Sequence, residues 1–205
     1  MRLANGGVAP GQMPMEVMQP PEGARVPNDI QDYYSDGVNI RDASDADWAQ
    51  IWPIVLATIR TGETYTWNPD AGEEACRSWW MQSARGRTFV AVDDDGTVLG
   101  TAISGPNQGG GGSHVGTGSF MVGAAYEGRG VGRALVEHVI DEARNDGFRS
   151  IQFNAVVETN VRAVQLWESV GFKILTTVPE GFRHPTEGYV GLHVMWRSLL
   201  EPVSG

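Results

Sequence analysis

The sequence is poor in cysteine and in basic side chains, and it has no long apolar run. Cys76 is the one cysteine in 205 residues, which excludes an internal disulfide framework and fits a reducing compartment. No apolar run approaches the roughly 20 residues that a membrane helix needs. The first residues also lack a basic segment followed by an apolar core. We therefore expect a cytoplasmic protein without a signal peptide or a membrane span.

Acidic side chains outnumber basic ones by 25 to 15, which gives a formal net charge of −10. A surface of this charge repels phosphate backbones, so binding to nucleic acid is not expected. It favours a cationic substrate instead. His138, His184 and His193 have no partner at the spacing of a metal site, and we expect no metal.

Composition divides the chain into three parts. Residues 1–37 are rich in Gly, Pro, Met and Gln and have no apolar period. They are interpreted as a flexible tail, with a partner-binding arm as the alternative. We expect one domain over residues 38–199 and a short C-terminal tail over residues 200–205. No internal repeat is present.

Apolar patterns and turn signals predict a mixed α/β sandwich within that domain. Residues 94–96, Asp-Asp-Gly, are typical of a hairpin turn, and Gly147 and Gly171 suit the ends of helices. The patterns predict strands at residues 38–40, 88–92, 98–103, 116–123, 150–156, 172–178 and 189–196, and helices at residues 48–59, 70–84, 131–143 and 159–170.

Three glycines at alternate positions, Gly128, Gly130 and Gly132, connect a predicted strand to a predicted helix. The first N–H groups of a helix have no intrahelical partner, and the helix dipole adds partial positive charge there. Glycines allow a phosphate to approach the main chain closely. This turn is therefore interpreted as a pyrophosphate site, and a glycine-rich turn without a ligand is the alternative.

Two common phosphate motifs do not fit this turn. No Lys-Ser or Lys-Thr follows the last glycine, which excludes a P-loop, and the glycine spacing differs from the dinucleotide fingerprint. The segment E-G-R-G-V-G, residues 127–132, instead resembles motif A of the GNAT acyl-CoA-dependent N-acetyltransferase superfamily, Q/R-x-x-G-x-G/A. Residues 160–172, N-V-R-A-V-Q-L-W-E-S-V-G-F, resemble its motif B, N-x-x-A-x-x-L-Y/W-x-x-x-G-F.

The resemblance covers about three quarters of the chain and implies a fold and a reaction. The implied fold is a single-domain α/β structure with a mixed, mostly antiparallel sheet, flanking helices and a splayed central strand pair. The implied reaction is transfer of an acetyl group from acetyl-CoA to an amine by direct attack in a ternary complex. Residues 62–66, 107–114, 153–154 and 181–185 look closest to small-amine acetyltransferases, such as the phosphinothricin and proline-analogue detoxifying enzymes.

The resemblance also assigns roles to particular residues. Main-chain N–H groups near Met121 and Val122 would bind the thioester carbonyl, and the glycine turn would bind the pyrophosphate. The full set implied for acetyl-CoA is Met121, Val122, Arg129, Gly130, Val131, Gly132, Arg133, Asn160 and Trp167. For Asn160 a helix-start role is the alternative, and for Arg133 simple solvation is.

Other residues are candidates for binding the acceptor and for proton transfer. Tyr65 and Trp67 lie in the loop that covers the acceptor pocket in the superfamily, and they either stack on a substrate or pack the loop. Asn154 and Asn107 are candidates to orient a substrate carboxylate. His114 is the candidate base, with a loop histidine that contacts main chain as the alternative. Tyr65, or water, is the candidate acid for the thiolate.

The sequence departs from the family pattern at two positions. Trp167 stands where the family often has the tyrosine that protonates the thiolate, and an indole has no titratable proton at neutral pH. Glu127 stands where Gln or Arg is usual, so its carboxylate is expected to turn away from the pyrophosphate, with Arg129 restoring positive charge. These departures keep a non-catalytic CoA-binding regulatory module open. A longer acyl-CoA, an aminoacyl-tRNA donor, a protein acceptor and a homodimer also stay open.

Overall fold

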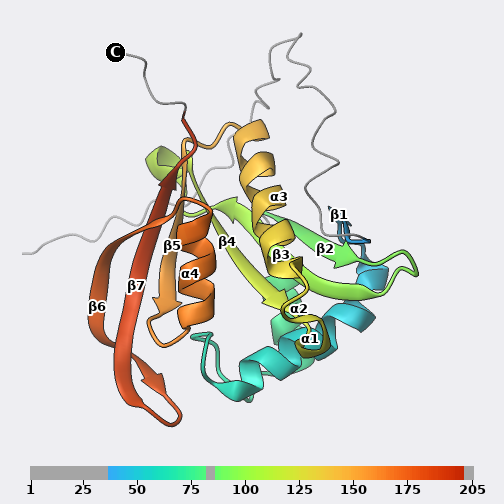
Figure 1. The fold of residues 1–205 in the computed structure, drawn as a ribbon, viewed down its shortest axis with the longest axis horizontal. Coiled ribbons are helices and arrows are strands. Elements are labelled where there is room, and N and C mark those ends of the chain that lie inside the picture. Colours follow the sequence, from blue (N-terminus) through green and yellow to red (C-terminus); the bar gives the residue numbers. More distant parts are fainter. Residues whose placement is uncertain (1–36, 82–85, 201–205) are drawn as a thin grey trace, which may run out of the picture. The chain divides into compact units, whose positions relative to one another are not determined.

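The computed structural model describes residues 37–81 and 86–200. Within them, seven strands form one sheet in the order β1-β2-β3-β4-β5-β7-β6 (Figure 1). Every neighbouring pair is antiparallel except β4 and β5. The elements are β1 (Asn39–Asp42), α1 (Trp48–Thr61), α2 (Glu73–Met81), β2 (Arg87–Val92), β3 (Val98–Pro106), β4 (Val115–Val122), α3 (Val131–Asn145), β5 (Ser150–Val157), α4 (Val161–Ser169), β6 (Lys173–His184) and β7 (Gly188–Ser198).

The order of strands and helices is the one expected from the sequence, and the mixed, mostly antiparallel sheet is confirmed. The largest difference is β6, which was predicted to end at residue 178 and reaches His184. Its register shifts between Val178 and Phe182, and Glu180 there has a left-handed φ of 53°. A bulge of this kind breaks the alternation that marks a strand, although pairing with β7 resumes beyond it. Residues 1–36 of the expected N-terminal tail, residues 82–84 of the second predicted helix and residues 201–205 of the expected C-terminal tail lie outside the described residues.

The sheet separates two apolar layers. Along β2, Phe89 and Ala91 pack on the side of α3, while Val90 and Val92 pack on the side of α1 and α2. This alternation follows from the period of two in an extended strand. Helix α3 carries apolar residues spaced for one face and is wholly buried along it, and α4 packs on the same side of the sheet.

The central strands β4 and β5 pair at only two positions. Val115 lies opposite Ser150 and Gly116 lies opposite Ile151, after which the strands separate. An aromatic cluster fills the widening gap on the α3 and α4 side. The rings of Phe120 and Phe153 each lie about 5 Å from the ring of Trp167, at 5.0 Å and 5.1 Å between centroids. The splayed pair expected from the family resemblance is therefore present, and Trp167 packs against an aromatic side chain from each of its strands.

A buried carboxylate fixes the start of α1 relative to β1. Asp47 accepts hydrogen bonds from the main-chain N–H of Ser44 at 2.7 Å and from its hydroxyl at 2.8 Å. The guanidinium of Arg41 donates to both of its oxygens, at 2.8 Å and 2.7 Å. These donors, chiefly the Arg41 guanidinium, hold the pKa of Asp47 well below its usual range.

We expect Asp47→Asn to lower the free energy of unfolding by about 2 kcal/mol near pH 7, because one partner of a buried, hydrogen-bonded charge is lost. A carboxyl whose pKa is depressed by folding stabilises the protein above its unfolded pKa of about 4, and this contribution falls as the pH drops below that value. Urea titrations between pH 7 and pH 3 should therefore show the gap between wild type and variant closing in acid. Asp45→Asn, at an exposed ion pair with Arg77, is the control and should change stability by about 0.5 kcal/mol or less. A gap that stays constant with pH would contradict this account.

Candidate active site

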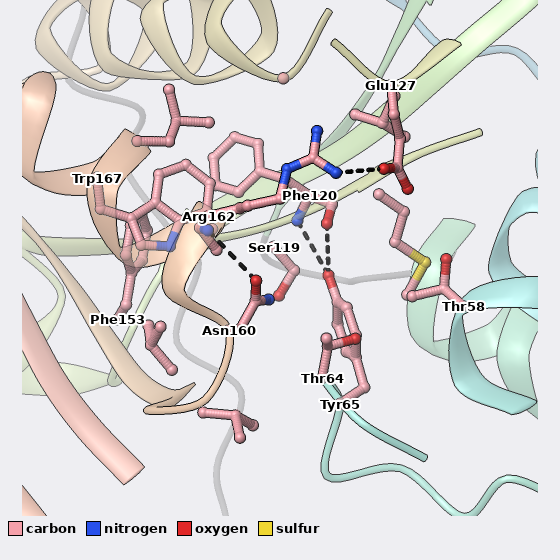
Figure 2. A pocket seen from close by; sticks show the side chains of 18 of the residues that line it. Thr58, Thr64, Tyr65, Ser119, Phe120, Glu127, Phe153, Asn160, Arg162 and Trp167 are labelled. Carbon is pink, nitrogen blue, oxygen red and sulfur yellow. Dashed lines mark hydrogen bonds and ion pairs between the residues drawn. The ribbon is translucent and has the colours of Figure 1, made fainter. Parts of the chain in front are cut away.

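A cavity of about 610 Å³ occupies the space where β4 and β5 separate. One wall is the end of β4 with the glycine turn and the start of α3, and the other is β5 with the start of α4 (Figure 2). Thr58 of α1 and residues 64–67 of the α1–α2 loop also line it. The cavity therefore has one end at the glycine turn and another beneath the loop that connects the first two helices.

The glycine turn has the backbone that its sequence requires. Gly128 and Gly130 have left-handed φ angles of 76° and 81°, which side-chain-bearing residues adopt at a cost. Gly130 is the residue immediately before α3, so the first N–H groups of the helix face the turn. The turn and its helix start line the cavity, and no carboxylate other than Glu127 lies among the lining residues. Main-chain donors and the helix dipole together make this end suited to an anion.

Main-chain groups of β4 are exposed to the cavity because its partner strand has separated. The Tyr65 hydroxyl donates to the carbonyl oxygen of Phe120 at 2.9 Å and accepts from its N–H at 3.1 Å. Tyr65 thus replaces the missing strand at this position. Because main-chain direction alternates along a strand, the N–H of Val122 points to the same side as that of Phe120.

The same alternation determines which way the N–H group of Met121 points. Its neighbour Gly123 donates to the carbonyl oxygen of Leu99 in β3 at 2.9 Å, and Met121 lies opposite Thr101 in that ladder. The N–H of Met121 therefore belongs to the sheet, while its side chain packs in the core with α1 and α2. Of the two donors considered for a thioester carbonyl, Val122 is the one that the alternation leaves facing the cavity.

Tyr65 is held on several sides. Its ring makes edge contacts with Trp67 at 5.7 Å and with Trp80 at 6.5 Å between centroids. Burial raises the pKa of its phenol above the ordinary value, although the Phe120 main chain opposes this. Trp67 also meets Trp79 at 4.9 Å. Aromatic packing therefore fixes the loop over the cavity, and the phenol is a poor source of a proton near neutral pH.

An ion pair joins the two walls at the rim of the cavity. Arg162, in the first turn of α4, donates from Nη1 to Oε2 of Glu127 at 2.6 Å (Figure 2). Arg129, which was expected to offset Glu127, instead lies over the ring of Tyr126 at 5.6 Å and is not among the lining residues. Arg133 lines the cavity while donating to Ser169 and Glu137. Sequence reasoning missed Arg162, although it lies two residues after Asn160 in motif B.

Two asparagines meet across the sheet at the other end. Asn154 of β5 lines the cavity, and its Nδ2 donates to Oδ1 of Asn107 at 2.6 Å. Gln152 donates to Oδ1 of Asn154 at 2.8 Å. The pairing brings Asn107 into contact with a lining residue, although Asn107 itself is not one. These carboxamides can both donate and accept but cannot act as a base.

The remaining predicted residues differ in where the structure places them. Asn160 lines the cavity and also caps α4, since its Oδ1 accepts from the N–H of Ala163 at 3.3 Å. Trp167 lines the cavity from its buried place in the aromatic cluster. His114 is exposed at the paired end of β4, where its carbonyl oxygen accepts from the N–H of Arg149 at 2.9 Å. It is not among the residues that line the cavity.

Residues 37–81 and 86–200 contain neither a cluster of metal ligands nor a membrane-spanning helix. In that part of the chain, no three His, Cys, Asp or Glu side chains form a group that could hold a metal ion. The helices described there are all too short or too polar to cross a membrane.

Known proteins resemble the chain in structure and in sequence. A structure from Kribbella flavida, a GCN5-related N-acetyltransferase, is 56% identical, with a TM-score of 0.77 over 79% of this chain and 98% of that one. An L-methionine sulfoximine/L-methionine sulfone acetyltransferase of Salmonella typhimurium is 28% identical over 70% of this chain and 84% of its own length. N-acetyltransferase aca1 of Schizosaccharomyces pombe is 31% identical over 51% of this chain, and the match spans about half of its own length, 51%.

The model of the acetyltransferase (GNAT) family matches residues 49–172. This range contains the glycine turn, both splayed strands and α4, which are the elements that form the cavity. It ends at Phe172, the last residue of motif B. The chain therefore belongs to the acetyltransferase (GNAT) family.

Proposed function

We propose that this acetyltransferase moves the acetyl group of acetyl-CoA to the amine of a small molecule, an amino or imino acid or a related metabolite. The observation that carries the proposal is the position of the α1–α2 loop, which lies over the cavity and is tied to β4 by Tyr65. A cavity bounded on this side by a fixed loop suits a small acceptor, whereas a peptide would need an open groove. Removal of a toxic amino acid is one role that fits such an activity.

The residues present fit acetyl-CoA as the acyl donor. The N–H groups of the glycine turn suit its pyrophosphate, and a Cβ at Gly132 would lie 3.5 Å from Leu166 and 3.7 Å from Val122, narrowing the gap between the walls. The N–H of Val122 is free to donate to the thioester oxygen, where negative charge develops during the reaction. The thioester supplies an activated acetyl carbon; the protein orients it between β4 and β5.

The acceptor end is lined by neutral polar groups. Thr58, Thr64, Thr66 and Ser119 provide hydroxyls, and Asn154 provides a carboxamide supported by Asn107. These groups can hold an amino acid's carboxylate by hydrogen bonds. Amino acid derivatives are also the substrates named for the relative from Salmonella typhimurium, of which the match covers 84%.

The chemistry then requires little from side chains. The amine nitrogen attacks the thioester carbon, a C–N bond forms and the C–S bond breaks. Among the residues that the structure describes, Glu127 is the one carboxylate that lines the cavity, and Arg162 holds it, so water is the proposed acceptor of the amine's proton. The thiolate takes a proton from water in turn. Holding both reactants in one geometry is the main contribution of the protein.

A non-catalytic CoA-binding module is the competing candidate, and it was suggested by Trp167 and Glu127. Each has another explanation in the structure. Trp167 is buried against the rings of both Phe120 and Phe153, so it fills the core beside the cavity. Glu127 is neutralised by Arg162. Neither residue therefore argues for loss of activity.

We expect the purified protein to release free thiol from acetyl-CoA in the presence of an amino or imino acid. The assay follows thiol release against a panel of amino acids, imino acids, polyamines and peptides, with mass spectrometry to find a product heavier by one acetyl group. Turnover with polyamines or peptides alone would contradict the proposed acceptor class. Binding of acetyl-CoA by calorimetry without any turnover would favour the non-catalytic module.

We expect Tyr65→Phe to lower kcat about tenfold with little change in the KM for acetyl-CoA, because Phe keeps the aromatic packing and removes the hydroxyl that orders the Phe120 main chain. The pH–rate profile should keep its shape, since the phenol positions the strand and supplies no proton. Tyr189→Phe, at an exposed tyrosine on β7, is the matched control. Loss of the alkaline limb of the profile, or a fall in kcat of more than about a hundredfold, would instead assign Tyr65 the role of acid.

A further inference from the structure

The ion pair between Glu127 and Arg162 lies at the end of the cavity that is formed by the glycine turn. Its two side chains are too exposed for the pair to contribute much to the stability of the fold. The side chains of Arg162 and Glu127 are 73% and 51% exposed. Pairs this exposed contribute little to stability, because water screens the charges and two long side chains must be ordered. A pair that costs little to break is available for exchange with another anion.

The negative charge of Glu127 lies where it would compete with an anionic ligand. It precedes Gly128, at a turn whose main-chain donors and helix dipole favour an anionic ligand. A bare carboxylate here would compete with that ligand for the donors and repel it. The guanidinium of Arg162 reaches across from α4 and neutralises this charge.

Other arginines near the turn are engaged elsewhere. Arg129 lies over the ring of Tyr126, and Arg133, although it lines the cavity, donates to Glu137 of α3 and Ser169 of α4. Of these three arginines, Arg162 is the one that forms an ion pair with a residue of the turn, Glu127. Both Arg162 and Glu127 line the cavity. Its guanidinium is therefore positioned beside the place where a phosphate would bind.

We propose that Arg162 binds the phosphate groups of the acyl donor, and that Glu127 holds the Arg162 guanidinium at the rim of the cavity until the donor arrives. This rests on the proposed function, in which the donor is acetyl-CoA. A phosphate with two anionic oxygens matches the planar fork of a guanidinium better than a single carboxylate oxygen at 2.6 Å does. Binding therefore moves the guanidinium from carboxylate to phosphate, and the Glu127–Arg162 pair acts as a latch between the walls.

If the pair acts as a latch, removing one member and removing the other should change the affinity for the donor in opposite directions. Removing Arg162 takes away a phosphate ligand and leaves Glu127 to repel the donor. Removing the charge of Glu127 frees the guanidinium, so the donor no longer competes with a carboxylate. A pair that only held the two walls together would give the same direction of change for both.

The test is calorimetric titration of CoA and of pantetheine, which lacks all the phosphates, into the full-length protein and its variants. We expect Arg162→Gln to weaken CoA binding about tenfold, the equivalent of one charge-assisted hydrogen bond. Pantetheine binding should stay the same within about twofold. Glu127→Gln should tighten CoA binding severalfold. Arg162→Lys, which keeps the charge and loses the fork, should fall between wild type and Arg162→Gln.

Arg144→Gln is the matched control, since Arg144 is another exposed helix arginine, 43% accessible and paired with Asp141 at 2.7 Å. It should bind both ligands like wild type, and thermal unfolding should show all variants folded. Unchanged CoA affinity in Arg162→Gln, or equal weakening of CoA and pantetheine, would overturn the proposal while leaving the proposed function intact. Failure of the wild-type protein to bind CoA would overturn both.

Discussion

The early end of hydrogen bonding between β4 and β5 is the constraint on which the rest of the structure depends. The two strands pair at two positions, and beyond them their main-chain groups no longer bond to each other. Buried N–H and C=O groups need partners. The protein meets this need with the Tyr65 hydroxyl at Phe120, and it leaves Val122 facing the cavity for a ligand.

Aromatic side chains bridge the two separated strands on the side of α3 and α4. Phe120 of β4 and Phe153 of β5 contact each other, and Trp167 of α4 packs against both rings. Phe153 also stacks on Phe172 at 4.3 Å, which continues the cluster beyond α4. Motif B therefore contains Trp167 of the aromatic cluster as well as Asn160 at the start of α4. Core packing and the lining of the cavity depend on the same short segment.

Much of the fold could be predicted because its signals are local. Apolar periodicity and glycine stops predict the order of helices and strands, and the glycine turn, whose residues are adjacent in sequence, marks one wall of the cavity. What could not be predicted depends on contacts between distant segments. The Tyr65 bond to Phe120 spans 55 residues and the Arg162 bond to Glu127 spans 35. The end of β6 was missed for another reason, because the bulge at Glu180 interrupts the period that a strand prediction needs.

The separation of β4 and β5 also ties the lifetime of the folded chain to its metabolic surroundings. A donor lying in the gap takes the place of a missing strand, and the unfolded chain has no such gap to offer. Any ligand that binds only the folded state stabilises it by mass action, by about 2.7 kcal/mol when its concentration is a hundred times the dissociation constant. The supply of the acyl donor would then set the protein's resistance to unfolding and proteolysis as well as its rate of turnover.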